Sequence, residues 1–343
     1  MRSVYFAIAR LACLTIPLAL ALALPAFSQS APQSDIPVVH YKAVPTWPKQ
    51  TLGDKGVPAP WNFWQVTSIA VEKNGNILLM HRGDDPILEY KPNGDLIGPW
   101  GEVKFDHGKV GGVAKKDRNP AASGYQAVYG AAGCSNCGAH EIRVDPQGDV
   151  WAVDAPGQVI YKMNPSGHVV MTLGTKGKPG MTAHNFYMPT DIAFAPNGEL
   201  VVSDGYGNAR IMRFSADGKL LGQFGHRGNG PGEFQLPHNV VIDKQGRIYV
   251  SDRDNQRVEV FDASGKFLSE WDHVGALSSL IMTPDQKIWA GGVLRDLDGK
   301  ALERLPGEGP NARAHGGAVA LNGDVYLGLL DGTAEKFVRG SAD

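Results

Sequence analysis

The sequence lacks a charge imbalance, has few cysteines and shows little of the apolar spacing that is typical of helices. Its 33 Lys and Arg residues are balanced by 35 Asp and Glu residues, so the formal net charge is −2. Proteins that bind nucleic acid usually present a basic surface, and this composition predicts neither a nucleic-acid partner nor a strongly acidic one. Turn-forming residues are abundant instead, with 43 Gly and 23 Pro among 343 residues. This length is sufficient for one sizeable all-β domain.

The first residues are typical of a secretory signal peptide. Arg2 and Arg10 flank the start of an apolar run that ends in small and polar residues near Ser28. We predict a signal peptide at 1–28, a disordered start of the mature chain at 29–37, and export to a bacterial periplasm or to the outside, with no membrane span after cleavage. The alternative is an uncleaved anchor, because the run is close to the length of a membrane span.

The chain has three cysteines, of which Cys13 belongs to the predicted signal peptide. Cys134 and Cys137 remain, in the segment GCSNCGAH. In an oxidising compartment these two residues predict a local disulfide that braces a loop. Haem attachment is not expected, because Gly138 and Ala139 separate Cys137 from the next histidine. A thioredoxin-like site is not expected either, because the βαβ context is missing.

A repeat organises the second half of the chain. The segments 186–225 and 234–271 agree in a proline, a turn glycine, Ser-Asp, Asn, Arg and Phe at equivalent positions, with a period of about 48 residues. Each copy consists of short apolar runs separated by Gly, Asn and Asp turns, which predicts four short antiparallel strands. A unit of four strands with this period is typical of a β-propeller blade.

Further copies of the unit predict an all-β, six-bladed propeller over 38–343. Its blades align on the turn positions Gly75, Gly148, Gly198, Gly246, Gln286 in a degenerate fifth copy, and Gly323. The segment PVVHYKAVPTWPK is expected to complete the last blade, because a propeller must close its ring. An insertion at about 102–132 separates the first two blades and is either a solvated loop or a cover for a substrate.

The same alignment selects one position in each blade, eight residues before the turn. In blade order this position holds Thr67, His140, Thr190, His238, Ser278 and His315. If it begins the innermost strand, the rotation that relates the blades brings three histidines from alternate blades together at the central channel. Three histidines with an open fourth position are typical of a catalytic zinc site, which we therefore predict here. We interpret six other histidines as structural: His40, His107, His168, His184, His226 and His273.

Charged and phenolic residues follow further along the same register. Arg82 and Arg253 lie fifteen residues beyond Thr67 and His238, and Tyr206 lies sixteen beyond Thr190. Two guanidinium groups can bind a carboxylate, and a phenol beside a metal can act as a general base. The alternatives are that Tyr206 caps a turn and that the arginines pair with the blade aspartates Asp154, Asp204 and Asp252.

Several of these segments resemble the blades of peptidyl-α-hydroxyglycine α-amidating lyases, within the wider NHL-repeat β-propellers. The segments are MPTDIAFAPNGELVVSDGYGNARI, LPHNVVID, VSDRDNQRV, LLMHRGDD and AHEIRVDPQGDVWAVD, and the resemblance extends from about Trp61 to Phe337. It implies a carbon–nitrogen lyase that converts a C-terminal α-hydroxyglycine into a peptide amide and glyoxylate. It also implies zinc on the three histidines, Tyr206 as the catalytic base, and Arg82 and Arg253 as ligands of the substrate carboxylate.

The sequence departs from the family pattern at three places. Gly316 stands where the family has an aspartate that binds calcium, which argues against that ion without excluding it. Arg313 replaces a methionine near the third histidine, and Gly207 replaces a cysteine beside the tyrosine. Nothing in the chain resembles the copper monooxygenase that makes the hydroxylated peptide.

Two other classes of function fit the sequence less well than the lyase. A non-catalytic NHL-repeat propeller would bind a protein or glycan, but it does not require histidines on alternate blades. A lactonase-type hydrolase would use carboxylate and Asn metal ligands at the channel, where this sequence has His, Thr and Ser. We therefore expect a monomeric enzyme that acts on a peptide or small molecule with a C-terminal carboxylate.

Overall fold

The structure is a computed structural model that describes residues 36–38, 40–49, 65–83, 85–105, 138–307 and 314–340. The predicted signal peptide, most of the predicted insertion, and the Cys134–Cys137 pair lie outside the described residues. Among the residues that are described, no helix has the length and apolar character needed to cross a membrane.

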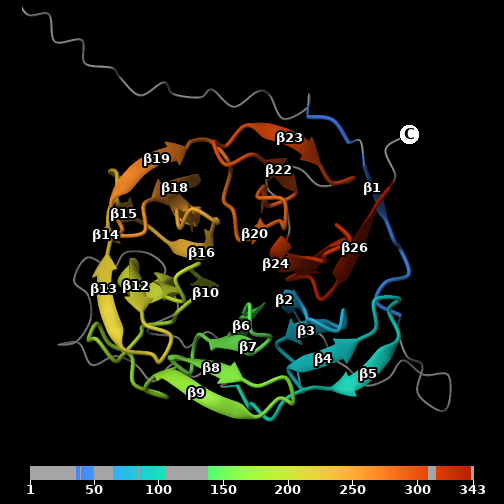
Figure 1. The fold of residues 1–343 in the computed structure, drawn as a ribbon, viewed down its shortest axis with the longest axis horizontal. Helices are drawn as coiled ribbons and strands as arrows, with labels where there is room; N and C mark the ends of the chain where they lie inside the picture. The colour runs from blue at the N-terminus through green and yellow to red at the C-terminus, as the bar shows by residue number, and fades with distance from the viewer. Residues whose placement is uncertain are drawn as a thin grey trace, which may run out of the picture.

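Six four-stranded antiparallel sheets surround a central axis (Figure 1), which confirms the predicted six-bladed propeller. The innermost strands of blades 1 to 6 are β2 (Val66–Val71), β6 (Ala139–Val144), β10 (Asp191–Phe194), β16 (Pro237–Ile242), β20 (Leu280–Met282) and β24 (Ala314–Val319). Each of these strands contacts the innermost strands of the two neighbouring blades, so the ring is closed.

The remaining strands extend each blade outward in chain order. The second strands are β3 (Ile77–His81), β7 (Val150–Asp154), β11 (Leu200–Asp204), β17 (Ile248–Asp252), β21 (Ile288–Ala290) and β25 (Val325–Leu329). The third strands are β4 (Ile87–Tyr90), β8 (Val159–Met163), β12 (Arg210–Phe214), β18 (Arg257–Phe261), β22 (Val293–Arg295) and β26 (Ala334–Arg339). The outermost strands are β5 (Leu96–Pro99), β9 (Val169–Gly174), β13 (Leu220–Phe224), β19 (Phe267–Trp271), β23 (Ala301–Arg304) and β1 (Tyr41–Ala43).

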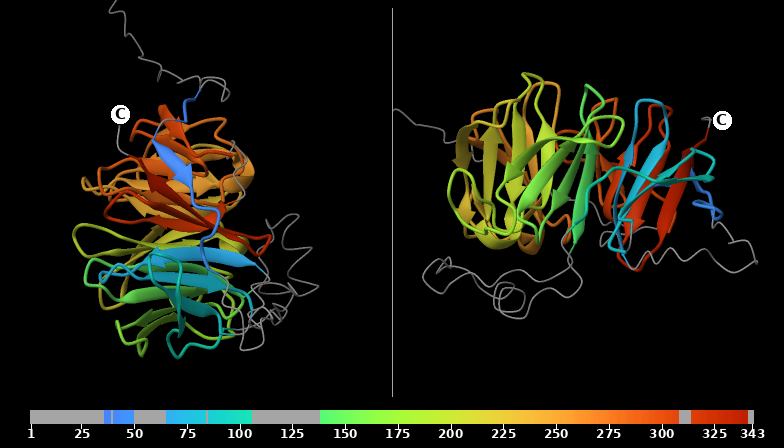
Figure 2. Two further views of the ribbon diagram at one scale, coloured as in Figure 1. Left: turned by 90° about the vertical axis from the view of Figure 1, so that its right-hand side faces the viewer. Right: turned by 90° about the horizontal axis from the view of Figure 1, so that it is seen from below.

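Four short elements of the described chain lie outside this scheme. The helical turns α2 (Gly205–Asn208) and η3 (Arg253–Asn255) follow the second strands of blades 3 and 4. A parallel pair, β14 (His226–Arg227) and β15 (Glu233–Phe234), lies between blades 3 and 4. Figure 2 shows the blades from the side, with their strands running between the two faces of the disc.

Strand β1 closes the ring, as the sequence predicts. It pairs antiparallel with β26, placing Tyr41 opposite Arg339. The chain before β1 lies against blade 5, where the main-chain N–H of Arg304 donates to the carbonyl of Pro37 at 3.0 Å. This N-terminal strand covers the edge of β26 and joins the two ends of the described chain in one blade.

The turn glycines used for the alignment share a left-handed backbone conformation. Their φ angles are 89° for Gly75, 99° for Gly148, 86° for Gly198, 84° for Gly246 and 89° for Gly323. Glycine adopts this conformation without steric cost, which is why the turns are visible in the sequence. Gln286 adopts it too, at 61°, so the fifth blade keeps the turn although its sequence is degenerate.

Apolar side chains of neighbouring blades pack face to face. One cluster joins Val153 and Ile160 of blade 2 to Ile192, Val202 and Met212 of blade 3, all buried. Full burial of such a side chain contributes about 1.5–3 kcal/mol, so these contacts fix each blade against the next.

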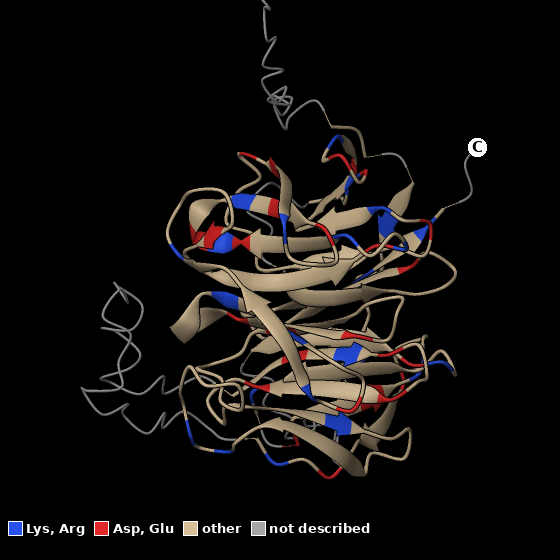
Figure 3. Ribbon diagram, turned by 60° about the vertical axis from the view of Figure 1, so that its left-hand side comes forward, with Lys and Arg blue, Asp and Glu red and all other residues tan. Residues whose placement is uncertain are grey.

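Charged residues of both signs are interspersed over the strands and loops visible in Figure 3, in keeping with the balanced composition.

Candidate active site

The three predicted metal ligands meet in the central channel. His140, His238 and His315 are the second residues of β6, β16 and β24, and all three are buried. One ligand atom from each lies within 4.8 Å of the others. Their ring centroids are 4.8 or 4.9 Å apart in every pair, which approximates threefold symmetry. The three histidines could therefore hold a metal ion.

A β-bulge turns each of these histidines out of its sheet. In blade 2 the pairing of β6 with β7 shifts at His140, which has no partner in the ladder. The same shift occurs at His238 and His315, and at Thr67 in blade 1. A bulged residue leaves the regular alternation of faces, and here it adds a side chain to the channel without disturbing the core on either side of the blade.

Main-chain carbonyls fix the protonation of two of the histidines. Nδ1 of His140 lies 2.7 Å from the carbonyl oxygen of Thr190, and Nδ1 of His315 lies 2.9 Å from that of Thr67. Because a carbonyl can only accept a hydrogen bond, Nδ1 must carry the proton and Nε2 presents its lone pair. In both cases the histidine of one blade donates to the main-chain carbonyl of the equivalent position in the next blade.

The electrostatic environment keeps the three imidazoles neutral. Burial lowers the pKa of His140 and of His238 well below the usual histidine value. His315, His238 and Arg82 lower the pKa of His140 further, and Arg253, His315 and Arg82 lower that of His238 further. Burial, assisted mainly by the charge of Arg82, lowers the pKa of His315 to about 3. Neutral imidazole is the form that binds a metal, so the ligand set is ready at neutral pH.

Tyr206 lies directly over the histidines. It belongs to α2, which follows the second strand of blade 3 and therefore lies at the same rim as the start of the innermost strands. Its hydroxyl oxygen is 3.0 Å from Nε2 of His140 and 3.2 Å from Nε2 of His238. Gly205 makes this approach possible, because a Cβ there would lie 2.1 Å from the carbonyl oxygen of Pro237.

Both predicted arginines lie at this rim as well, each directly after a second strand. Arg82 donates through Nη1 to Oε1 of Gln65 at 2.5 Å, and Arg253 donates through Nε to Oδ1 of Asp254 at 3.0 Å. The guanidinium carbon of Arg253 is 6.0 Å from the ring centroid of Tyr206. The structure thus brings all six predicted site residues together at one end of the channel.

Two of the three aspartates considered as alternative partners, Asp204 and Asp252, bind other arginines. Asp204 accepts from Nε of Arg210 at 2.9 Å, and Asp252 accepts from Nε of Arg257 at 3.2 Å. Both arginines also donate to main-chain carbonyls of the loop that leads into their own blade. The aspartate and arginine that the two repeats share therefore stabilise the loops by hydrogen bonds. Tyr206 and Arg253 occupy positions at which the two repeats differ.

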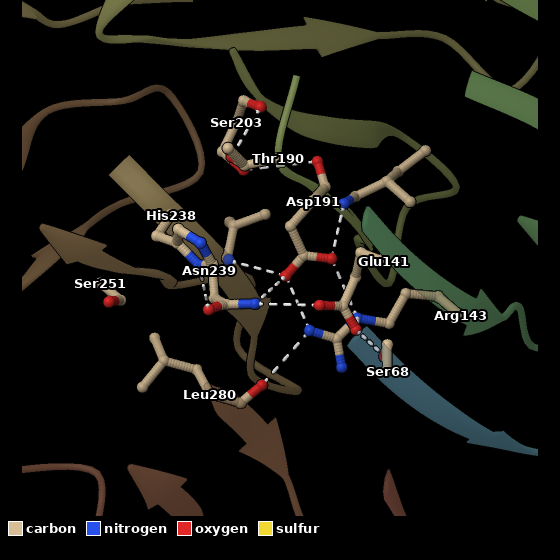
Figure 4. Close-up of polar contacts among 12 residues, drawn as sticks. Ser68, Glu141, Arg143, Thr190, Asp191, Ser203, His238, Asn239, Ser251 and Leu280 are labelled. Atoms are coloured by element: carbon tan, nitrogen blue, oxygen red, sulfur yellow. Dashed lines mark hydrogen bonds and ion pairs between the residues drawn. The ribbon is translucent and has the colours of Figure 1, made fainter. Parts of the chain in front are cut away.

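A second polar layer, which the sequence analysis did not identify, lies directly below the histidines (Figure 4). The carboxylate of Asp191 accepts hydrogen bonds from Nε and Nη2 of Arg143, at 3.0 and 2.7 Å. It also accepts one from Nδ2 of Asn239 at 3.2 Å. Glu141 accepts from Asn239 at 3.3 Å and from the hydroxyl of Ser68. Burial raises the pKa of Glu141 to about 8. The carboxyl groups and the amide that a lactonase-type centre would need are thus present one layer deeper. There the carboxyl groups face the guanidinium of Arg143, and the amide donates to the carboxyl groups.

The alignment of the blades contains a pattern that indicates this layer. Its members follow the channel position by one residue: Ser68, Glu141, Asp191, Asn239, Ser279 and Gly316. Most of them are polar and all are buried, which is unusual for the interior of a strand.

Two of the departures from the family pattern have a structural explanation. A Cβ at Gly316 would lie 2.7 Å from Oγ of Ser68, so no calcium-binding side chain fits there in this packing. A Cβ at Gly207 would lie 2.2 Å from the ring of Tyr187, which fills the space beside Tyr206. Arg313 lies outside the described residues.

Comparison with known proteins agrees with the fold and the resemblance. A family described as a six-bladed β-propeller matches residues 188–291. The chain is 35% identical over 217 residues to a probable peptidyl-α-hydroxyglycine α-amidating lyase of Caenorhabditis elegans, covering 61% of this chain and 57% of that protein. It is 36% identical over 150 residues to NHL repeat-containing protein 3 of Mus musculus, covering 40% of this chain and 43% of that protein.

These matches define how far the similarity extends. The chain spans about half the length of the two curated relatives. A streptogramin B lyase structure superposes with a TM-score of 0.52 and 14% identity, covering 82% of this chain and 96% of that one, which concerns the fold alone. The predicted similarity to amidating lyases and NHL-repeat propellers is confirmed.

Proposed function

We propose that this protein is a zinc-dependent carbon–nitrogen lyase that converts a C-terminal α-hydroxyglycine, or a similar α-hydroxy-amide, into an amide and glyoxylate. The observation that carries the proposal is the position of the Tyr206 hydroxyl, within hydrogen-bonding distance of Nε2 of both His140 and His238. A general base has to lie this close to the proton that it removes. The similarity to an amidating lyase supports the same reaction.

The donor set fits zinc. Three neutral imidazoles whose ligand atoms lie within 4.8 Å of one another match the ligand set of catalytic zinc sites, which use three protein ligands and leave a fourth position for the substrate. A zinc ion bound there would supply a Lewis acid that polarises an oxygen of the substrate. The low pKa of each histidine means that none of them competes for the proton of the substrate hydroxyl.

The chain's own residues account for the remaining steps. Arg82 and Arg253, on opposite sides of Tyr206 in the blade order, would bind the carboxylate and set the orientation of the substrate. Tyr206 would accept the proton of the α-hydroxyl group. The carbon–oxygen bond then becomes a carbonyl, the carbon–nitrogen bond breaks, and its electron pair goes to the amide nitrogen. Return of the proton from Tyr206 to that nitrogen balances the reaction, so no other reactant is needed.

Turnover of an α-hydroxyglycine compound tests the proposal. Zinc-loaded protein is incubated with a peptide ending in α-hydroxyglycine, and glyoxylate and peptide amide are both quantified. Equal amounts of the two products, formed faster than in the uncatalysed reaction, support the lyase. Zinc binding without products would refute this substrate while leaving the metal centre intact.

A further inference from the structure

We propose that Asn239 is a positioning residue that fixes the tautomer of His238 and so determines which of its nitrogens faces the metal. This inference rests on the metal centre of the proposed function. It concerns a side chain that does not itself face the substrate, and it follows from how the second polar layer is built.

His238 differs from the other two histidines in its hydrogen-bond partner. Nδ1 of His140 and of His315 donates to a main-chain carbonyl, which no side-chain substitution can remove. Nδ1 of His238 lies 3.0 Å from a side-chain oxygen instead, Oδ1 of Asn239. The other ring nitrogen, Nε2, lies 3.2 Å from the Tyr206 hydroxyl, which can either donate or accept. The Asn239 amide is therefore the partner that decides where the proton of His238 lies, and its effect depends on which way the amide faces.

The amide has only one orientation that satisfies its surroundings. On the side away from His238, Nδ2 of the amide lies 3.2 Å from Oδ2 of Asp191 and 3.3 Å from Oε2 of Glu141. Oδ2 of Asp191 also accepts from the main-chain N–H of Val240 at 3.1 Å, so it acts as an acceptor. The amide NH₂ must therefore face the carboxylates, and the amide oxygen must face His238.

Arg143 holds the carboxylate of Asp191 in place. It donates two hydrogen bonds to Asp191 and a third, at 3.3 Å, to the carbonyl of Leu280. Asp191, Glu141 and Asn239 are each fully buried. Figure 4 shows these side chains converging from several blades, so the sequence of contacts runs from Arg143 through Asp191 to Asn239 and then to His238.

The consequence for the metal follows from imidazole chemistry. With the oxygen of Asn239 facing Nδ1, the proton stays on Nδ1 and Nε2 presents a lone pair to the channel. Without that acceptor, the proton can move to Nε2, which then points an N–H at the position of the metal. Outer partners of metal-binding histidines commonly contribute about 10–100-fold in metal affinity.

The test combines metal-free NMR with zinc affinity. Nitrogen-15 shifts of the histidines report the tautomer of His238 in the metal-free protein, and competition with a chelator gives the zinc Kd. The informative variant is Asn239→Leu, which keeps the size but has no acceptor. Asn239→Asp keeps an oxygen on the side of His238. Ser68→Ala is the matched control, because it removes another partner of Glu141 without touching a histidine.

We expect Asn239→Leu to produce an Nε2–H signal from His238 and to weaken zinc binding about 10–100-fold. Asn239→Asp keeps the Nδ1–H tautomer, and Ser68→Ala leaves both the tautomer and the zinc affinity near the wild-type values. If Asn239→Leu does not fold by circular dichroism, Asn239→Ala makes the same test.

The inference is overturned if His238 keeps its Nδ1–H tautomer in the variant without an acceptor, or if Ser68→Ala weakens zinc binding as much. Failure of the wild-type protein to bind zinc would overturn the metal centre of the proposed function. In that case the NMR comparison, which needs no metal, still decides the role of Asn239.

Discussion

The hydroxyl of Tyr206 lies 3.0 Å from Nε2 of His140, the nitrogen whose lone pair faces the channel. Since Nδ1 of His140 donates to the carbonyl of Thr190, Nε2 is the acceptor of this hydrogen bond and the phenol is the donor. A cation bound by the histidines would take that lone pair and lie beside the phenolic oxygen.

Removal of this hydroxyl should abolish most of the activity without removing the metal. For Tyr206→Phe we expect kcat to fall by about 10²–10⁴-fold, the usual contribution of a general base. The zinc content should be unchanged, because the three imidazoles remain. Steady-state kinetics of glyoxylate release and metal analysis check both expectations. A variant that keeps kcat within a few-fold of the wild-type value would show that another group removes the proton.

Arg253 should affect substrate binding through the carboxylate. Loss of a charge-assisted hydrogen bond costs about 1.5–3 kcal/mol, so for Arg253→Ala we expect kcat/KM to fall by roughly 10–100-fold. The matched control is Arg213→Ala, since Arg213 pairs with Glu199 on a blade edge away from the site.

The substrate offers the second control for Arg253. With a substrate whose carboxylate is esterified, wild type and Arg253→Ala should have similar kcat/KM values, because no carboxylate is left to bind. A tenfold difference that persists with the ester would mean that Arg253 acts on something other than the carboxylate.

Glu259 should make stability depend on pH. This buried side chain of β18 accepts from the main-chain N–H of Gly232 at 2.8 Å, and burial raises its pKa from 4.5 to about 8. The folded protein therefore retains a proton that the unfolded chain has lost. The associated stability is fully present below pH 4.5 and is lost as the pH rises through about 8.

The neutral variant Glu259→Gln isolates this effect. Between pH 5 and pH 9 its free energy of unfolding should rise relative to that of wild type by roughly 1–3 kcal/mol. Urea denaturation at several pH values measures the difference. A difference that stays constant over the range would show that Glu259 ionises normally in the folded state.

Gly207 should not tolerate a side chain. Its missing Cβ position lies 2.2 Å from the ring of Tyr187, so Gly207→Ala forces that ring to move. We expect a loss of roughly 1–3 kcal/mol in stability and reduced activity, because Tyr206 is the adjacent residue. Gly222→Ala in β13 is the control, since no atom lies within 4 Å of its Cβ position. Equal stabilities of the two variants in thermal denaturation would contradict this account.

The sequence was sufficient for the fold and for the inner ring of the site because both depend on the repeat. Gly198 and its counterparts mark turns that require positive φ, and these turns give a register from which the positions of His140 and Tyr206 follow. The register does not show which way a side chain turns at the start of a strand. The bulge that directs His140 into the channel depends on pairing between strands, which no single residue type reveals.

The second polar layer was missed for a related reason. Asp191 and Arg143 belong to different blades, and their hydrogen bonds depend on how the blades close around the axis. The register shows polar residues at most of the equivalent positions, but it does not show which of these residues bind one another. The orientation of the Asn239 amide is even harder to predict from the sequence, because it depends on the positions of the carboxyl groups around it.

The most direct test of the central claim is the zinc content of the purified protein and of its His238→Ala variant, measured after exposure to excess zinc and removal of unbound metal. The three-histidine centre predicts about one zinc per chain in the wild-type protein and a large loss in the variant, with both proteins folded by circular dichroism. A variant that retains the wild-type zinc content would contradict the centre, and with it the proposed lyase mechanism.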